Sequence, residues 1–232
     1  AGSAAVLAFL AAVLWFPQVE RGPWPVTPVE PGRYRRLLGR PVTWFVTGFF
    51  AVQSMTFYLM LAWLPTVFRD AGLPAADAGN LLALTNAVQI GSTLLMPQIA
   101  ARARTQAPHA VIATLTTLAG FAGVMLAPTT APWLWMVVLG LGQGSTISLA
   151  LLIITLRAPD PESVTALSAV AQTVAYVFAA AGPMLIGAIH EATGGWTVPL
   201  GVAVGLSGVQ VIFAYLAGRP VRESARRVVV SP

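Results

Sequence analysis

The sequence predicts an all-α integral membrane protein whose main part is a bundle of six membrane-spanning helices. The 232-residue chain is 56% hydrophobic and only 9% charged, and its mean hydropathy is +0.76, whereas soluble domains carry about 25% charged residues. A chain so poor in charge cannot cover a water-exposed surface, so most of its surface must face lipid or other apolar helices. Two further observations agree: the apolar residues gather in long runs, and the arginines lie between those runs.

The first apolar run, residues 4–16, is too short to cross a bilayer. As a helix it would rise about 20 Å, against the ~30 Å of a hydrocarbon core. We therefore expect residues 1–16 to be the end of a truncated transmembrane helix. A signal peptide is the alternative, but no basic residue precedes the run and Pro17 follows it.

Residues 17–41 form the longest polar stretch and contain the segment VERGPWPVTPVEPGRYRRLLGR. Its Pro, Gly and Arg residues are typical of a linker rather than of a packed domain. We expect a solvated cytoplasmic linker that contacts lipid head groups, with a regulatory role as the alternative.

Six further apolar runs have the length that a tilted transmembrane helix needs. They are residues 42–68, 79–101, 110–127, 133–156, 166–189 and 198–217. Together they predict a C-terminal six-helix bundle over residues 42–217, followed by a basic cytoplasmic tail over residues 218–232.

The arginines predict the orientation of the bundle. Every arginine except Arg69 falls in alternate segments: the linker, the loop with Arg102 and Arg104, the loop with Arg157, and the tail. By the positive-inside rule these segments face the cytoplasm, so both ends of the bundle are predicted to be cytoplasmic. Half of a twelve-helix transporter has this layout. Residues 1–16 would then be its sixth helix, and an N-terminal six-helix half would be missing from this sequence.

Several spans carry polar side chains that are costly to expose to lipid. Pairs three or four residues apart share one helix face, so we expect a polar stripe on each of four helices, lining a central substrate cavity. The residues are Gln53, Ser54, Tyr58, Asn86, Gln89, Gln143, Ser145, Gln172 and Tyr176. The alternative is that these side chains only hold the helices together, as polar groups in membrane proteins often do.

The remaining two spans, the third and the sixth, are more apolar and are expected to support the bundle or face lipid, although the sixth contains Gln210. Gly140, Gly142 and Gly144 flank Gln143 and predict that another helix approaches closely there.

The residue types exclude several classes of protein. No Asp, Glu, Arg or His lies at the centre of a span, so a group for proton coupling would belong to the missing N-terminal half. The sequence has no cysteine, no pair of histidines spaced for metal, and no HExxH, GxSxG or GxxxxGKS/T motif. We therefore expect no enzyme activity, no cofactor and no metal. His109 and His190 are predicted to be interfacial.

The sequence pI of about 10.7 could indicate binding to nucleic acid. The arginines, however, sit in short segments beside apolar spans, where membrane topology and anionic lipids explain them. We expect no nucleic-acid partner.

Three stretches resemble a known family. They are FFAVQSMTFYLMLAWLPTVFRDAGLPAADAGNLLAL at 49–84, GLGQGSTISLALLIITLRAPDPESVTALSAVAQTVAYVFAAAGPMLIGAIHEATGGW at 140–196, and MPQIAARARTQ at 96–106. They resemble the major facilitator superfamily, and within it the cyanate-transporter-like family that also includes 2-nitroimidazole transporters. The third stretch looks like a degenerate copy of the superfamily's basic loop, because it lacks the usual Gly and Asp. The gating contacts attributed to that motif are therefore in doubt here.

The resemblance implies the superfamily's fold: a twelve-helix transporter of the bacterial inner membrane, of which this chain resembles the C-terminal half. It implies transport of a small polar or anionic solute, cyanate-like or nitroimidazole-like, by alternating access, and a monomer at full length. A multidrug or general organic-solute exporter of the same superfamily is the first alternative. A membrane scaffold that transports nothing is the second.

Overall fold

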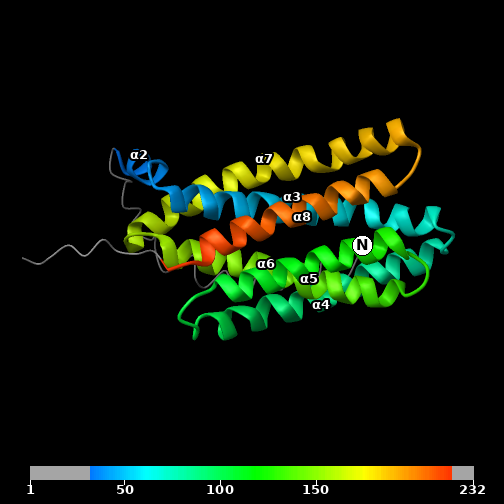
Figure 1. The fold of residues 1–232 in the computed structure, drawn as a ribbon, viewed down its shortest axis with the longest axis horizontal. Coiled ribbons are helices and arrows are strands. Elements are labelled where there is room, and N and C mark those ends of the chain that lie inside the picture. Colours follow the sequence, from blue (N-terminus) through cyan, green and yellow to red (C-terminus); the bar gives the residue numbers. More distant parts are fainter. Residues whose placement is uncertain (1–31, 221–232) are drawn as a thin grey trace, which may run out of the picture. The chain divides into compact units, whose positions relative to one another are not determined.

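The computed structural model describes residues 32–220, and every regular element in them is a helix, which confirms the predicted all-α fold (Figure 1). The truncated helix predicted for residues 1–16 lies outside the described residues. So do residues 17–31 of the predicted linker and residues 221–232 of the predicted tail.

The described part of the linker contains a short helix, α2 (Arg33–Leu38), that the sequence analysis did not predict. It follows Gly32, whose φ of 91° lies in the left-handed region that glycine adopts without a side-chain clash. Leu37 of α2 is 2% exposed and belongs to the core. Six residues are too few for a helical period to show in the sequence, which is why this element was missed.

Six long helices follow, one for each of the six predicted apolar runs; α4 and α5 end one residue before the predicted runs 79–101 and 110–127 do. They are α3 (Pro41–Asp70), α4 (Ala75–Ala100), α5 (Ala107–Leu126), α6 (Pro132–Arg157), α7 (Pro161–Thr193) and α8 (Thr197–Gly218). Proline near the first helical position, as at Pro41, costs no hydrogen bond because that N–H has no partner within the helix. At the start of α7 the Asp160 carboxylate accepts a hydrogen bond from the Ser163 N–H at 2.8 Å, a favourable N-cap.

Five of the described helices are long and apolar enough to cross a membrane: α3, α5, α6, α7 and α8. Helix α4 is long enough but more polar, since it carries Asn80, Asn86, Gln89 and Gln98. That α4 spans the membrane stays a prediction.

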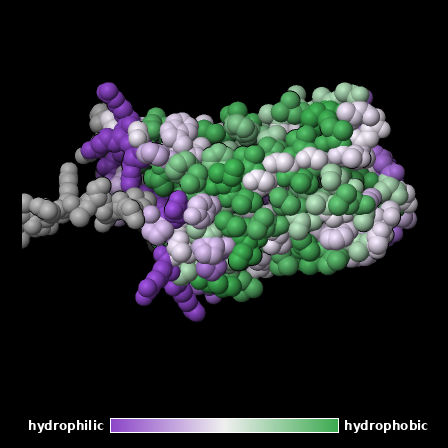
Figure 2. Space-filling model, in the orientation of Figure 1, coloured by the Kyte–Doolittle hydropathy of each residue, from purple (hydrophilic) through white to green (hydrophobic). Residues whose placement is uncertain are grey.

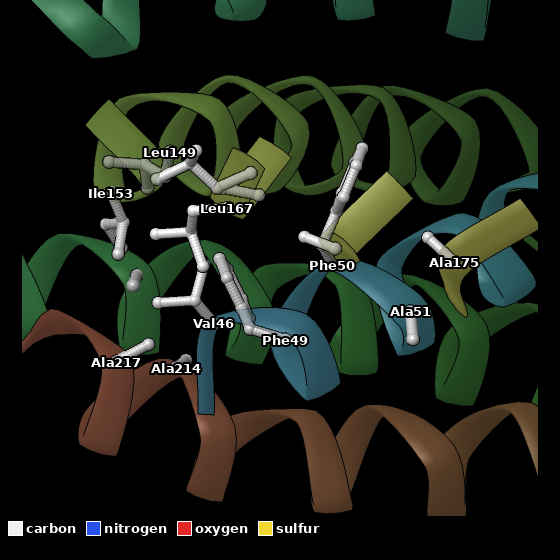
Figure 3. Packing of buried hydrophobic residues seen from close by; sticks show 14 of the residues in the cluster. Val46, Phe49, Phe50, Ala51, Leu149, Ile153, Leu167, Ala175, Ala214 and Ala217 are labelled. Carbon is white, nitrogen blue, oxygen red and sulfur yellow. The ribbon is translucent and has the colours of Figure 1, made fainter. Parts of the chain in front are cut away.

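The helices pack in a definite set of pairs. Helix α3 lies along α7 and α8, α4 lies along α6, and α5 contacts both α6 and α8 (Figure 1). The apolar side chains form two clusters. The first includes Val46, Phe49, Leu149, Ile153 and Leu167, several of which are seen together in Figure 3. The second lies farther along α3 and includes Leu59, Leu64, Phe68, Phe121 and Met136.

The seam between α4 and α6 is unusually close. A Cβ at Gly144 would overlap the Ser92 Oγ and the Gln89 carbonyl oxygen, so the predicted role of the α6 glycines in helix approach is confirmed. Hydroxyls of α4 also donate to α6 carbonyls across this seam. Thr93 Oγ1 bonds Gly144 O at 3.1 Å, and Thr85 Oγ1 bonds Met136 O at 3.0 Å.

The arginines of the described residues, except Arg69, lie in or beside helix ends that share one end of the bundle. Figure 2 shows hydrophilic side chains gathered at that end, where α2 lies, and a mostly hydrophobic band beyond it. Arg157, the last residue of α6, donates to Ala217 O at 3.0 Å and to Gly218 O at 2.8 Å. A cation suits this position because the last carbonyls of a helix carry partial negative charge.

Helix α2 is tied to α7 by a buried cation. The Arg33 side chain is 10% exposed; it donates to Asp160 Oδ1 at 2.9 Å and also pairs with Glu162. Partial desolvation by itself would raise the pKa of the Asp160 carboxyl. The hydrogen bonds from Ser163 and the charge of Arg33 outweigh that effect and lower the pKa below its ordinary value. Asp160 is therefore ionised at physiological pH, and the contact is not a pH switch in that range.

We predict that Gly144→Ala in the full-length protein lowers the free energy of unfolding by about 1–3 kcal/mol, because the new methyl group meets α4 backbone that cannot yield without moving the helix. Thermal unfolding in detergent measures this. The matched control is Gly208→Ala on α8, where a Cβ meets nothing within 4 Å. Equal thermal unfolding midpoints for the two variants would contradict the conclusion that α4 and α6 pack too closely to admit a side chain at position 144.

We predict that Arg33→Gln releases α2 and speeds amide hydrogen exchange over residues 33–38, while Arg35→Gln, at an exposed position, changes it little. Since the pKa of Asp160 is lowered, the contact is present above the ordinary carboxylate pKa of about 3.9 and is lost as pH falls through the lowered value. Protection, corrected for intrinsic exchange, should therefore stay constant from about pH 8 to 5. A loss of protection within that interval would count against the assignment.

Candidate solute-binding site

A layer of hydrogen-bonded polar side chains crosses the middle of the bundle, between the two apolar clusters. It joins Gln53 and Thr56 of α3, Gln143 and Thr146 of α6, and Gln210 of α8, all of which are fully buried. Gln53 Nε2 donates to Gln143 Oε1 at 2.6 Å and to Gln143 O at 3.2 Å. Gln143 Nε2 donates to Thr56 Oγ1 at 3.2 Å. Together with the bond from Gln210 Nε2 to Gln53 Oε1, these contacts link α3 to both α6 and α8.

The amide of Gln53 is fully used within this layer. A glutamine side chain offers two N–H donors and an oxygen with two lone pairs. Both donors of Gln53 serve Gln143, and its Oε1 accepts from Thr146 Oγ1 and from Gln210 Nε2, the latter at 3.2 Å. No hydrogen-bonding capacity of Gln53 is left over.

A cavity of about 180 Å³ lies directly beside the layer. Helices α3, α4, α6 and α7 all contribute to its wall. The lining residues are Phe50, Gln53, Ser54, Phe57, Tyr58, Gln89, Ile147 and Tyr176. Tyr58 is 39% exposed and Tyr176 is 54% exposed, whereas Gln53 is at 0%, so the cavity runs from a closed floor at the polar layer to an open mouth between α3 and α7.

A second, more open hollow of about 260 Å³ lies on α4. It is lined by Asn86, Gln89, Ile90, Thr93 and Leu94. Gln89 lines both hollows.

The structure brings together five of the nine predicted site residues and separates the others. Around the first cavity lie Gln53, Ser54, Tyr58, Gln89 and Tyr176. Gln143 is buried behind Gln53, and Asn86 lines the second hollow, where its Nδ2 donates to Leu82 O at 3.0 Å. Two predicted residues line neither hollow: Ser145, which is 5% exposed, and Gln172, which donates to Ser168 Oγ at 2.6 Å on its own helix. That any of the nine contacts a solute stays a prediction.

The predicted site residues leave out three members of the polar layer, although the sequence showed Thr146 and Gln210 as polar residues within spans, and two aromatic residues of the cavity wall. Thr56 and Thr146 follow Gln53 and Gln143 by three residues, so the spacing rule could have placed them on the same faces. Gln210 lies on α8, whose other residues are mostly apolar, and no pattern indicated that it points at α3. Phe50 and Phe57 carry no polar group and lie in an apolar run, so nothing in the sequence distinguished them from its other residues.

The predicted interfacial histidines lie toward opposite ends of the bundle. The His190 ring, at the end of α7, stacks on the Trp196 ring. The ring centroids are 3.9 Å apart, and the angle between the ring planes is 12°. Trp196 Nε1 in turn donates to Asp70 Oδ2 at 2.8 Å, which joins the ends of α3, α7 and α8. His109 lies in the first turn of α5. Among residues 32–220 there is no group of three His, Asp or Glu that could hold a metal ion.

Comparison with known proteins places the chain in a family. Residues 1–183 match the family model of the Major Facilitator Superfamily. The chain is 36% identical to the 2-nitroimidazole transporter of Escherichia coli over 212 residues, which cover 90% of this chain and 53% of that protein.

Two further relatives are similar over slightly shorter stretches. An uncharacterized transporter of Bacillus subtilis, YycB, is 34% identical over 197 residues, covering 84% of this chain and 48% of that protein. The cyanate transport protein CynX of E. coli is 29% identical over 183 residues, which cover 77% of this chain and 47% of that protein. The chain thus spans about half the length of the curated relatives it matches.

The family match and these relatives confirm the resemblance to transporters of the cyanate and nitroimidazole type. The membrane-length helices and the all-helical bundle fit the same assignment. The chain belongs to the Major Facilitator Superfamily.

Proposed function

We propose that this chain forms the C-terminal half of a secondary transporter that moves a small polar or anionic solute across the membrane by alternating access. In such transporters two helical halves rock about a site near the middle of the membrane. The N-terminal six-helix half would supply the opposite wall of that site.

The cavity beside the polar layer is the observation that carries this proposal. Polar groups are expensive in a membrane interior and are retained there mainly for function or for helix contacts. Both uses are found here. The amide of Gln53 is occupied by contacts between helices. Ser54, Tyr58 and Tyr176 line the cavity, and no hydrogen bond of their hydroxyls is found among the described residues. Hydroxyls placed in this way are suited to bind a solute.

The length of the relatives supports the two-half arrangement, since they are about twice as long as the match. We propose that the arginine-rich end of the bundle, with α2, faces the cytoplasm, because basic residues accumulate on that side of bacterial inner membranes. The protein would need no cofactor, would act as a monomer, and would take any proton coupling from its other half.

One prediction of the proposed function concerns transport itself. Cells that lack their own uptake and express the full-length protein should accumulate labelled cyanate or 2-nitroimidazole, or should export it, with saturable kinetics. A protonophore should abolish the flux if transport is coupled to protons. Flux of many bulky apolar compounds outward would favour the exporter alternative. If the protein is well expressed and moves none of these solutes, the result contradicts transport and supports the scaffold alternative.

The second prediction concerns the polar layer. We expect Gln53→Leu to lower the free energy of unfolding by about 2 kcal/mol, because Gln143, Thr146 and Gln210 lose buried partners. Thermal unfolding in detergent provides the measurement, and the exposed Gln98→Leu of α4 is the control, expected to stay within about 0.5 kcal/mol. If Gln53→Leu is as stable as the parent but transports nothing, Gln53 acts on the solute and not on the helices.

A further inference from the structure

The arginine-rich end of the bundle carries exposed apolar side chains that the solute site does not use. Tyr34 and Leu38 of α2 are 44% and 41% exposed, and Trp44 in the first turn of α3 is 49% exposed. Tyr34 and Leu38 are four residues apart and therefore share one face of α2. Trp44 joins them, because its indole Nε1 donates to Leu38 O at 2.9 Å. Together these three side chains form the α2 patch.

The α2 patch belongs to a helix whose opposite face is fixed to the bundle. Leu37 packs in the core, and the buried Arg33 pairs with Asp160 and Glu162 at the start of α7. The patch is therefore preformed, so a partner does not first have to order it. Residues 33–44 contain no acidic side chain, and this stretch of the surface is thus both apolar and cationic.

Trp44 lies at the depth where a membrane surface is expected. Helices α3 and α8 run antiparallel (Figure 1), and a Cβ at Gly48 would overlap the Phe213 ring, so these two residues lie side by side. At 1.5 Å per residue toward the arginine-rich end, Trp44 lies ~6 Å and Tyr215 ~3 Å beyond them. Exposed aromatic side chains on two helices are therefore at nearly the same depth, as in the aromatic belt of a membrane interface.

Arginines accompany the aromatic side chains on both helices. On α8, the Arg219 guanidinium lies over the Tyr215 ring, 4.7 Å from its centroid. On α2, Arg35 and Arg36 are exposed, and Arg35 lies ~60° around the helix from Leu38 at 3.6 residues per turn. Apolar and arginine side chains on adjacent faces are typical of a helix that lies in the membrane interface.

A phospholipid with an anionic head group matches both parts of this surface. Its acyl chains and glycerol would cover the three apolar side chains, which water covers poorly. Its phosphate would lie near Arg35, where no carboxylate of residues 33–44 competes. The cytoplasmic leaflet is rich in such lipids, and basic residues at its surface bind them.

We propose that α2 lies in the head-group layer and binds an anionic phospholipid, with Arg35 at the phosphate and the α2 patch among the upper acyl chains. Helix α2 is then a membrane contact of the linker and not a solvated segment. The lipid would hold the outer face of α2, while Arg33 and Leu37 hold its inner face. This inference goes beyond the proposed function and does not require transport of any solute.

Fluorescence quenching of the full-length protein in lipid nanodiscs tests this. The discs are phosphatidylcholine with a fixed mole fraction of brominated lipid, either phosphatidylglycerol or phosphatidylcholine, and bromine quenches a tryptophan only on contact. The signal of Trp44 is the difference between the parent and Trp44→Phe. We expect both lipids to quench Trp44, with an association constant at least about fivefold higher for the anionic one, the effect of one arginine at an anionic surface.

The variant Arg35→Gln should lower this preference about fivefold, and Arg35→Lys, which keeps the charge, should retain it. Arg104→Gln removes an exposed arginine from the same end of the bundle and is the matched control, expected to keep the preference of the parent. Because Arg35→Gln leaves Arg33 and Leu37 in place, it should not alter the unfolding temperature in detergent.

Three other results would each contradict the proposal. An equal loss of preference in Arg35→Gln and Arg104→Gln would mean that the lipid follows the net charge of the whole end and that no local site exists. Equal quenching by the two brominated lipids would show contact with the membrane but no selection for an anionic head group. A Trp44 that neither lipid quenches would lie against another part of the full-length protein. None of these results bears on transport, which the flux measurement tests separately.

Discussion

The rest of this structure depends on one constraint: an amide placed inside an apolar bundle must find its hydrogen bonds from other helices. Gln53 meets the constraint completely, with Gln143, Thr146 and Gln210 as partners. Because these partners lie on α6 and α8, the three helices can meet only in the register that brings the four side chains together. The apolar clusters on either side, around Phe49 and around Phe68, then fill the space that this register leaves.

The same constraint divides the polar residues into two functional groups. Side chains that bond one another across α3, α6 and α8 form the polar layer, although Gln210 Oε1 in that layer has no partner among the described residues, and Ser54, Tyr58 and Tyr176, which make no such bonds, line the cavity. Gln53 belongs to the polar layer although it lines the cavity, while Gln89 lines the cavity and has a buried Oε1 with no hydrogen-bond partner within residues 32–220. Exposure alone would not separate these roles; the count of donors and acceptors does.

Much of the fold followed from the sequence, because apolar runs of membrane-spanning length have few alternative structures. Helices α3 to α8 were expected from hydropathy, and Gln53 and Gln143 were recognised as important. Their partners were not, since helical spacing tells which residues share a face and not which helix that face meets. Gln210 was passed over for this reason. Helix α2 was not predicted from the sequence because it is stabilised by contacts between residues distant in sequence. Leu37 packs in the core, and Arg33 pairs with Asp160 at the start of α7.

The seam between α4 and α6 has a consequence for how selectivity is encoded. A Cβ at position 144 would lie only 2.4 Å from the Gln89 carbonyl oxygen. A residue on the neighbouring helix that has no side chain therefore sets how close to α6 the Gln89 backbone lies, and with it the Gln89 side chain that lines the cavity. Two homologous proteins with identical cavity linings would hold the side chain at position 89 at different depths if one carried alanine at position 144. A comparison of cavity residues alone would then assign them the same preference, and it would be mistaken.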